Sequence, residues 1–506
     1  MTNYSNNGKM ILKITHKLTS DLWSEPEPMG EFNRVGLDQI GAYSLSYDGN
    51  TFLFTSRRSP GIGNFDIFMT ERKGDKWTTP KNLGKPVNSE TNDGFPFLAA
   101  DNKTLYFARC KKMDLEKCSD CSIYQVTKKN SQYWNMPEEI TGLAPASDIS
   151  APRIMMDHET LVFAAKIPGN KGGYDLYQQN LNQLKLKPDA LDYLNTPGDD
   201  VFISIPTTGE WAYFSTIFRE RYNLIVAQVP ENLRPGKVLA ASGKITDHHQ
   251  VPMDAVVKIS DPMTGKVLNF ARTDQDGHYF IVAKLSGQLD ITAKALDDSY
   301  LFAYHRFRNY SDQSIYLPLD FDLRPLKPRT TYESWNFDFQ PCSAALTKSS
   351  EAAIKRWLEV LRSNHEFKME MEVYLPEIIS DTIPSCPELT EIKIDTIYHE
   401  VADSLILANL TAENDTTTGL DTLNAMDSTF IPTELEVELP VDLTPFDLEY
   451  TYHNDRTPAM AAAIKAELLR LGVPENAFTI IGNGDQHGLA IENFKEGSLV
   501  RIRFIP

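Results

Sequence analysis

At 506 residues, the chain is too long for a single hydrophobic core, and its length predicts about three domains. It contains no apolar stretch approaching the roughly 20 residues that a membrane-spanning helix requires. Its net charge of −19 argues against a nucleic-acid-binding protein, because phosphate contacts require clustered Lys and Arg side chains.

The first residues do not form a signal peptide, since Asn3, Asn6 and Asn7 stand where its apolar core would be. Residues 10–18 and 22–26 match only the third and fourth strands of a unit that recurs further along the chain. The first copy is therefore predicted to be incomplete, with its missing strands supplied by ring closure with the last copy or by sequence upstream. We expect a truncated start, so the missing signal peptide is weak evidence about location.

The recurring unit is clearest at residues 43–84. Alternating residues at 43–47, the turn pair Asp48-Gly49 and the apolar run 51–54 predict two strands joined by a tight turn. A Gly-rich connection, a third apolar run and a fourth run that ends in a proline follow. The unit is predicted to be a four-stranded antiparallel sheet.

The landmarks of this unit recur at a spacing of roughly 50 residues, which is typical of β-propeller blades. The second strand ends on Phe54, Phe107, Phe163 and Phe214; the preceding turns are Asp48-Gly49, Asp101-Asn102, Asp157-His158 and Thr208-Gly209; the fourth strands carry Pro26, Pro80, Pro137, Pro188 and Pro235. We predict a β-propeller of about five blades over residues 1–239. An irregular sandwich is the alternative, but it need not repeat four landmarks.

Three of the five cysteines, Cys110, Cys118 and Cys121, fall in blade two. Cys118 and Cys121 form a C-x-x-C pair, which suits half a zinc site, a redox pair or part of a disulfide. A metal site needs four ligands, and only Cys110 is an obvious third. The sequence favours a structural disulfide or plain thiols over a metal site, and it favours redox catalysis least, since no βαβ pattern surrounds the pair.

Short alternating strands separated by Gly and Asp turns follow, and they predict a small β-sandwich over residues 240–325. The segments Gly243–Asp247, Thr264–Lys266 and Thr273–Tyr279 resemble the carboxypeptidase regulatory-like domain. This resemblance implies a spacer, not an enzyme. The two aspartates in the last segment would suit calcium, but Asp-x-Asp-Gly at a hairpin is more often turn chemistry.

Residues 326–506 are predicted to form an α+β domain. Apolar residues recur at helical spacing in 350–363, and a second helix is expected at 458–471, with strands at 367–373, 478–481 and 499–504. The F-D-F segment ending at Phe339, the second helix and the I-I-G-N-G segment resemble the OmpA-like C-terminal domain. That family binds the carboxylate and amine of diaminopimelate in peptidoglycan.

Two residues carry peptidoglycan binding in the OmpA-like family, and this chain departs from both. The family's aspartate follows the first long strand, where this chain has Leu375-Pro376. The family's arginine, a bidentate fork for the carboxylate, falls on Met460. Arg456, one turn earlier, is the only nearby substitute and the one candidate peptidoglycan-binding residue.

An acidic insert at about 377–450 separates these two positions and carries a net charge of −16. Its Thr- and Asp-rich middle, 411–429, is expected to be a mobile loop. The alternating runs 392–397 and 434–439 are expected to pair as a hairpin. We interpret the insert as a solvated insertion; the alternative is a site that binds basic partners or calcium.

No catalytic signature appears in the sequence, and we predict a protein that is not an enzyme and needs no cofactor. The order of a PD40/WD40-like propeller, a regulatory-like sandwich and an OmpA-like domain resembles the PorE-type component of the type IX secretion and gliding machinery of Bacteroidetes-like bacteria. The helical-repeat segment that precedes the propeller in that family is absent from this sequence. The resemblance implies a periplasmic, outer-membrane-associated scaffold whose partners are secretion or motility proteins and the cell wall.

Two other classes of function stay open at this point. One is a propeller that binds a protein or carbohydrate, with an OmpA-like domain that no longer binds peptidoglycan. A ring of aromatic residues at the mouth of the channel would favour it. The other is a propeller hydrolase, which would need Asp, Glu or His side chains clustered at one end of the channel.

Overall fold

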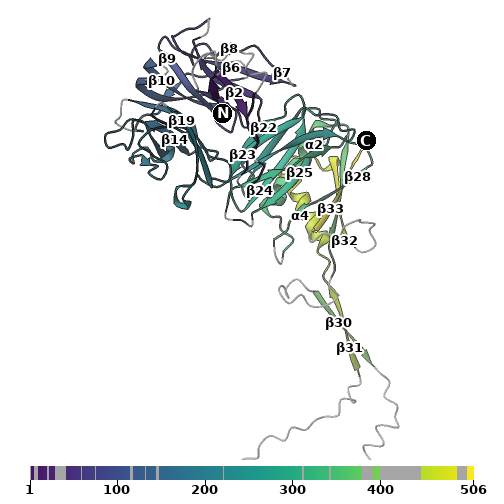
Figure 1. Cartoon of the computed structure of the whole chain (residues 1–506). Helices are drawn as coiled ribbons and strands as arrows, with labels where there is room; N and C mark the ends of the chain where they lie inside the picture. Colours follow the sequence, from purple (N-terminus) through teal and green to yellow (C-terminus); the bar gives the residue numbers. More distant parts are fainter. Residues whose placement is uncertain are drawn as a thin grey trace, which may run out of the picture. The chain divides into compact units, whose positions relative to one another are not determined.

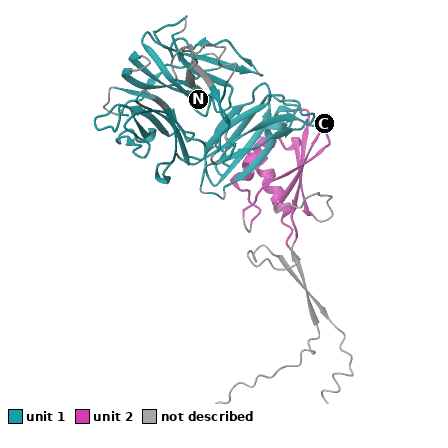
Figure 2. Ribbon diagram, in the orientation of Figure 1, with its two compact units in different colours: residues 1–327, 358–364 teal, residues 328–357, 365–506 magenta. Residues whose placement is uncertain are grey.

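The computed structural model describes residues 2–4, 10–16, 18–19, 22–28, 42–57, 60–74, 76–113, 118–130, 133–143, 148–219, 221–309, 311, 313–340, 343–378, 391–398, 446–486 and 498–506. These residues fold mainly into antiparallel β-sheets (Figure 1). The chain divides into two compact units (Figure 2), residues 1–327 with 358–364, and residues 328–357 with 365–506. None of the described helices is long and apolar enough to cross a membrane.

The first part of unit 1 is a series of five separate sheets in chain order. They are β1 (Thr2–Tyr4), β2 (Met10–Ile14) and β3 (Glu27–Pro28); β4 (Tyr43–Leu45), β5 (Thr51–Ser56), β6 (Asp66–Lys73), β7 (Lys76–Trp77) and β8 (Lys81–Asn82); β9 (Asn92–Leu98), β10 (Thr104–Met113), β11 (Cys118–Thr127) and β12 (Glu138–Glu139); β13 (Ile149–Ile154), β14 (Thr160–Ala165), β15 (Asp175–Asn180) and β16 (Asp189–Ala190); and β17 (Asp199–Ser204), β18 (Trp211–Phe218) and β19 (Arg221–Gln228). Neighbouring strands pair as antiparallel hairpins in each sheet.

The repeated landmarks occupy equivalent places in these sheets. The four repeated phenylalanines lie on the second strand and are at most 2% exposed. The second residue of each predicted turn has a left-handed φ, with 75° at Gly49, 55° at Asn102, 58° at His158 and 72° at Gly209. A tight hairpin turn needs this conformation, which Gly, Asn and His tolerate better than most residues.

Four of the five repeated prolines directly precede the short last strand of a sheet. Pro26, Pro80, Pro137 and Pro188 come just before β3, β8, β12 and β16, each of two residues. Proline lacks the N–H that a longer ladder would use, which keeps this outer strand short. Pro235 has no such strand after it, and the sheet of β17–β19 has three strands among the described residues.

Consecutive sheets are joined by the same contact twice. The Asn88 side chain accepts from the Ile67 N–H (2.9 Å) and donates to the Ile67 carbonyl (2.9 Å). Asn195 repeats both bonds with Leu176, at 2.8 and 3.1 Å. Each asparagine lies on the segment that leads into the next sheet. Its side-chain amide makes the two hydrogen bonds to a third-strand residue that a neighbouring strand would otherwise make.

The sheet of β1–β3 contacts the last sheet, because Trp23 packs edge-on against Tyr213 of β18 with ring centroids 6.0 Å apart. Sheets that pack in chain order, with the first against the last, have the arrangement of propeller blades. The predicted third and fourth strands of the first blade correspond to β2 and β3. The structure adds β1, which pairs with β2.

The second part of unit 1 consists of two four-stranded sheets. One contains β20 (Val238–Asp247), β23 (His278–Lys284), β26 (Ile315–Pro318) and β27 (Phe321–Leu323), and the other β21 (Ala255–Ser260), β22 (Val267–Arg272), β24 (Gln288–Ala295) and β25 (Ala303–Arg308). Alternate residues of both sheets form one buried apolar cluster, which includes Leu239, Val257, Ile281 and Ile291. Two sheets that share such a core form a sandwich.

Unit 2 is built on a four-stranded sheet in the order β28 (Thr331–Phe337), β33 (Ser498–Ile505), β29 (Lys368–Leu375) and β32 (Phe478–Asp485). Only β29 and β32 are parallel. Helix α2 (Lys348–Ser363) lies between β28 and β29 in sequence, and α4 (Thr457–Arg470) precedes β32.

One strand of the predicted hairpin of the acidic insert is present in the structure, and the other lies outside the described residues. β30 (Glu391–Tyr398), which contains the predicted run 392–397, pairs with β31 (Phe446–His453). Residues 446–452 carry Phe, Leu, Tyr and Tyr at alternate positions, a stronger strand pattern than Glu alternating with Leu and Val. Residues 434–439 and the predicted mobile loop 411–429 lie outside the described residues, as does most of the insert.

Candidate functional site

Two aromatic side chains from separate sheets meet at the axis of the propeller-like sheets. Phe95 of β9 stacks on Phe202 of β17 with ring centroids 6.1 Å apart, although a whole sheet separates these strands in chain order. Both residues have left-handed φ angles, 54° and 56°, at breaks in the strand register. These breaks turn the two rings toward each other, so the innermost strands meet at this level.

A second level of the axis is occupied by Arg153 of β13, which is 8% exposed. Its guanidinium donates to the carbonyl of Pro152 (3.0 Å) and more weakly to that of Tyr43 (3.4 Å), and lies over the Phe97 ring, 4.9 Å from the centroid. Burial lowers the pKa of Arg153 to about 10 and raises that of Tyr47 to about 12. Arg153 therefore links the inner strands of three sheets.

The buried aspartates near the start of the inner strands hold loops in place. Asp93 accepts from the Ser89 N–H and from Arg109 Nε, both at 2.6 Å. Asp200 accepts from the Thr196 N–H (2.6 Å). Burial raises the pKa of both carboxyl groups, although the Arg109 charge opposes this at Asp93. Their oxygens are engaged within the fold.

Within the described ranges, two groups of three Asp, Glu, His or Cys side chains lie close enough together to hold one metal ion: the three cysteines, and Asp274, Asp276 and His278. In the second group, Asp274 Oδ1 accepts from the N–H groups of Asp276 (2.9 Å) and His278 (2.8 Å). This is the hydrogen bonding of an Asx turn. Its geometry fits the turn chemistry that the sequence favoured over calcium.

The sandwich covers the end of the propeller-like sheets where the turns between first and second strands lie. Tyr47 stacks on Phe280 with centroids 5.7 Å apart, and five apolar residues bury themselves beside this pair. Polar contacts surround the stack: Asn50 with Asp274 (3.0 Å), Gly236 with Asp157 (2.7 Å) and Lys284 with Glu159 (3.2 Å). The sandwich and these sheets therefore belong to one compact unit. The resemblance implied a spacer, but this sandwich is packed against the sheets and is not independent of them.

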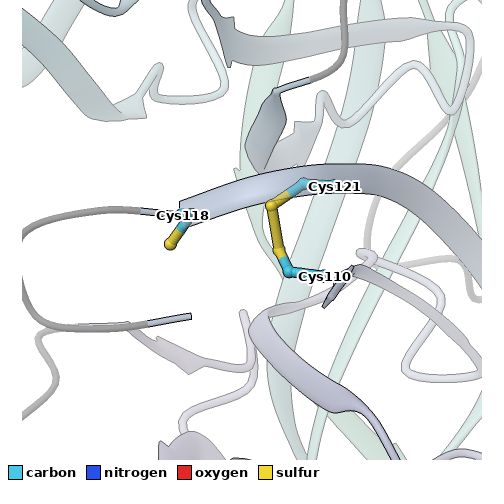
Figure 3. A group of neighbouring side chains, drawn as sticks. All are labelled: Cys110, Cys118 and Cys121. Carbon is cyan, nitrogen blue, oxygen red and sulfur yellow. A yellow bond between two sulfur atoms is a disulfide. The ribbon is translucent and has the colours of Figure 1, made fainter. Parts of the chain in front are cut away.

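Cys110 and Cys121 form a disulfide between the directly paired strands β10 and β11, and Cys118 is not part of it (Figure 3). The sequence placed these three cysteines together and favoured a disulfide or plain thiols over a metal. The pair it singled out, Cys118 with Cys121, is not the bonded pair. Direct cross-strand pairing of Cys110 with Cys121 is the physical reason.

The predicted peptidoglycan site lies at the start of α4. Met460 is 2% exposed and belongs to the buried side of the helix, and Leu375 is 5% exposed at the end of β29. Pro376 follows it and is half-buried. Neither family position presents a charge to a ligand, because apolar residues occupy both.

Arg456 is the N-cap residue of α4 and is half-buried. Its Nε is buried and donates no hydrogen bond within the described part of the chain. Next to it, the Thr457 hydroxyl donates to Asp455 (2.7 Å) and accepts from the Gly484 N–H (3.0 Å), which fixes the helix start against β32. A cation with unused hydrogen-bonding capacity thus lies one turn before the family position.

The sequence analysis did not identify the buried Arg153 or the two asparagines that bond to third strands. Arg153 follows Pro152 in a strand that reads as apolar, and nothing local marks it as an axial residue. Asn88 and Asn195 do carry a signal, since each lies in an Asn-Ser/Thr segment that leads into an inner strand. Aligning those segments would have found them.

No protein-family model matches the chain, and no curated protein matches it significantly. Among solved structures, it is similar to TolB from Acinetobacter baumannii, with 13% identity and a TM-score of 0.26 over 64% of this chain and 80% of that one. A thermostable family-43 glycoside hydrolase gives 11% identity and a TM-score of 0.29, over 57% of this chain and 93% of that one.

A 3-chlorocatechol 1,2-dioxygenase from Rhodococcus opacus 1CP is similar over 18% of this chain, with 10% identity and a TM-score of 0.15; the chain spans 61% of that structure. Similarities at such TM-scores carry no argument about function.

Proposed function

We propose that the chain is a non-enzymatic scaffold of the bacterial cell envelope, of the PorE-like type, in which the propeller docks a protein partner and the C-terminal domain contacts the cell wall. The observation that carries the proposal is the order of the three modules along the sequence, which resembles that family. In this proposal the chain is periplasmic and associated with outer-membrane secretion or motility proteins.

The arrangement of unit 1 narrows where the partner would dock. The sandwich occupies the end that carries the turns after the first strands, through Tyr47 and Phe280. In antiparallel hairpins the next connections lie at the opposite end. The docking surface would therefore be the end formed by the connections between second and third strands, which include Gly63 and Gly172.

The side chains that fill the axis favour a scaffold function over a hydrolase function. A catalytic channel needs convergent polar groups that can reach a substrate. At the two levels described, the axis holds the Phe95–Phe202 stack and the buried Arg153, and the nearby aspartates bond within the fold. A docking role uses the loops and leaves the axis as a structural core.

Contact with the wall would depend on Arg456. Its guanidinium could pair with the diaminopimelate carboxylate in the manner of the family's arginine. The second candidate, a protein-binding module whose C-terminal domain has lost peptidoglycan, is favoured by one observation: Met460 and Leu375 are buried apolar residues at the two family positions.

A co-sedimentation assay of the full-length chain with purified peptidoglycan separates these candidates. We expect the wild type to pellet, free diaminopimelate to release it, and Arg456→Ala to lower its affinity about tenfold. Lys465→Ala is the matched control, since it removes the same charge from α4 where Lys465 forms an exposed pair with Glu475 (2.5 Å). A wild type that stays in the supernatant would reject the wall contact and leave the protein-binding candidate.

A further inference from the structure

Cys110, Cys118 and Cys121 bring three sulfur atoms together at the end of the propeller-like sheets opposite the sandwich. Their Sγ atoms all lie within 4.8 Å of one another. Cys110 pairs directly with Cys121 across β10 and β11, and Cys118 begins β11. A disulfide and a third sulfur of the same chain are therefore neighbours.

The backbone explains why Cys118 faces the disulfide. Residues three apart on a regular strand point to opposite faces. Asp120, between Cys118 and Cys121, has a left-handed φ of 52°, which interrupts that alternation. Cys118 and the disulfide consequently lie on the same side of β11 (Figure 3).

The next sheet holds this stretch of β11 in place. The Asp120 N–H donates to Asp148 Oδ1 (2.9 Å), and the Tyr174 hydroxyl donates to the Cys118 carbonyl (3.3 Å). Burial is the main reason that the pKa of Tyr174 is raised, so its hydroxyl stays a donor at neutral pH. The position of Cys118 beside the disulfide is thus fixed by contacts outside its own hairpin.

The three sulfurs differ in access to solvent. Cys110 is 1% exposed and Cys121 is 3% exposed, in an apolar cluster with Met113 and Phe65. Cys118 is half-buried. An external thiol must approach a disulfide sulfur in line with the bond, so burial of both sulfurs blocks direct attack, whereas Cys118 can be reached from outside.

We propose that the three cysteines form a thiol–disulfide relay in which Cys118 is the site of exchange with external thiols. The Cys118 thiolate attacks one sulfur of the Cys110–Cys121 disulfide; a new S–S bond forms, the old one breaks, and the departing sulfur takes the electron pair and a proton. This step involves no net oxidation.

The exchange places the disulfide on Cys118, where a small thiol can attack it. Attack by a first thiolate gives a mixed disulfide with Cys118 and releases the other cysteine. A second thiolate then displaces Cys118, so two external thiols are oxidised to their disulfide and the protein disulfide is reduced. The reverse sequence forms the buried disulfide from three thiols and an external disulfide.

The kinetic test follows reduction of the disulfide by dithiothreitol at about pH 8, in full-length protein whose other two cysteines, Cys342 and Cys386, are serine. Cys118→Ser leaves the Cys110–Cys121 disulfide intact, and we expect it to slow reduction about tenfold. Ser119→Ala changes the adjacent side chain, keeps all three sulfurs and should react at the wild-type rate.

A second measurement tests the rearranged state directly. After mild oxidation, Cys110→Ser should contain a Cys118–Cys121 disulfide, identified by acid quenching and peptide mapping. The proposal requires the slower reduction of Cys118→Ser and a disulfide between Cys118 and one of the other two cysteines. Cys121→Ser is the companion variant and would contain a Cys110–Cys118 disulfide if Cys118 attacks Cys110 instead. The proposal is overturned if Cys118→Ser is reduced within about twofold of the wild-type rate, or if Cys110→Ser and Cys121→Ser both keep two alkylatable thiols.

Discussion

Between consecutive sheets of the repeat, single asparagine side chains make the hydrogen bonds that a neighbouring strand would make. Asn88 and Asn195 each bind both backbone groups of a third-strand residue, as an adjacent strand would. Asp66 and Asp175 organise the preceding connections in the same way, since their carboxylates accept from the Gly63 and Gly172 N–H groups at 3.0 and 3.1 Å. The repeat is therefore a repeat of hydrogen bonds as well as of strands.

Gly63 and Gly172 are the residues that this packing tolerates least to change. A Cβ atom at Gly63 would lie 1.9 Å from the Thr91 carbonyl oxygen, and one at Gly172 would lie 1.8 Å from that of Gly198. We expect either alanine substitution to destabilise unit 1 by about 3 kcal/mol, because backbone must move. Thermal unfolding measures this.

Gly287→Ala is the matched control for these two substitutions, since no atom lies within 4 Å of its added Cβ. It should leave the midpoint of unfolding unchanged. Equal midpoints for all three variants would show that the two connections do not pack against the following segments.

His305 makes stability depend on pH. Burial lowers the pKa of this imidazole on β25 below its ordinary value. As the pH falls through about 6.5, the unfolded chain binds a proton that the folded one resists, so the stability contributed by His305 is lost on acidification. His305→Gln should therefore lose less stability than the wild type between about pH 7.5 and about pH 5.

Urea titrations at the two pH values measure this difference. His365→Gln serves as the control, since it removes a histidine from outside the sandwich. An equal loss of stability in the wild type and in His305→Gln would contradict the pKa shift.

At the scale of elements, the outer strands are short and the sandwich attaches through a small apolar patch. Tyr47, on the segment after β4, and Phe280 of β23 stack with an interplanar angle of 10°. A double-mutant cycle with Tyr47→Ala and Phe280→Ala should give a coupling of about 1 kcal/mol, because stacked aromatic pairs add stability beyond their buried area.

The cycle is read from chemical unfolding of the full-length chain. Phe270→Ala with Tyr47→Ala provides a comparison, since Phe270 contacts the Lys103 ammonium (3.5 Å) instead of Tyr47. A coupling near zero for Tyr47 with Phe280 would mean that the stack contributes nothing to holding the sandwich on the sheets.

At the scale of the whole molecule, we expect the acidic insert to be separable from the core of unit 2. β30 pairs with β31, and the four-stranded sheet and the helices supply buried residues among those described, such as Phe337, Met371, Ile464 and Phe504. Replacing residues 399–445 by Asn-Gly, a turn suited to two-residue hairpins, should leave the unfolding midpoint of unit 2 unchanged.

Differential scanning calorimetry of the shortened chain checks this expectation. A marked loss of stability would show that the replaced segment supports the fold. The same variant tests the charge of the replaced segment, since wall binding that survives the replacement cannot depend on the acidic residues at 399–445.

Much of the architecture follows from the sequence alone, because its causes are local. Turn pairs such as Asp48-Gly49 need left-handed backbone, prolines such as Pro80 shorten an outer strand, and alternating apolar residues select the buried face. These signals act within a few residues, so repeated strands, the sandwich and both helices of unit 2 were predictable.

Only the tertiary structure decided which distant residues meet. The pairing of Cys110 with Cys121, the partner of β30, the stack of Phe95 on Phe202 and the burial of Arg153 all depend on strand register or ring geometry. Register is fixed by many weak contacts summed over whole sheets, and no single residue records it. The sequence could single out Arg456 and the three cysteines, but the contacts that these residues make were visible only in the fold.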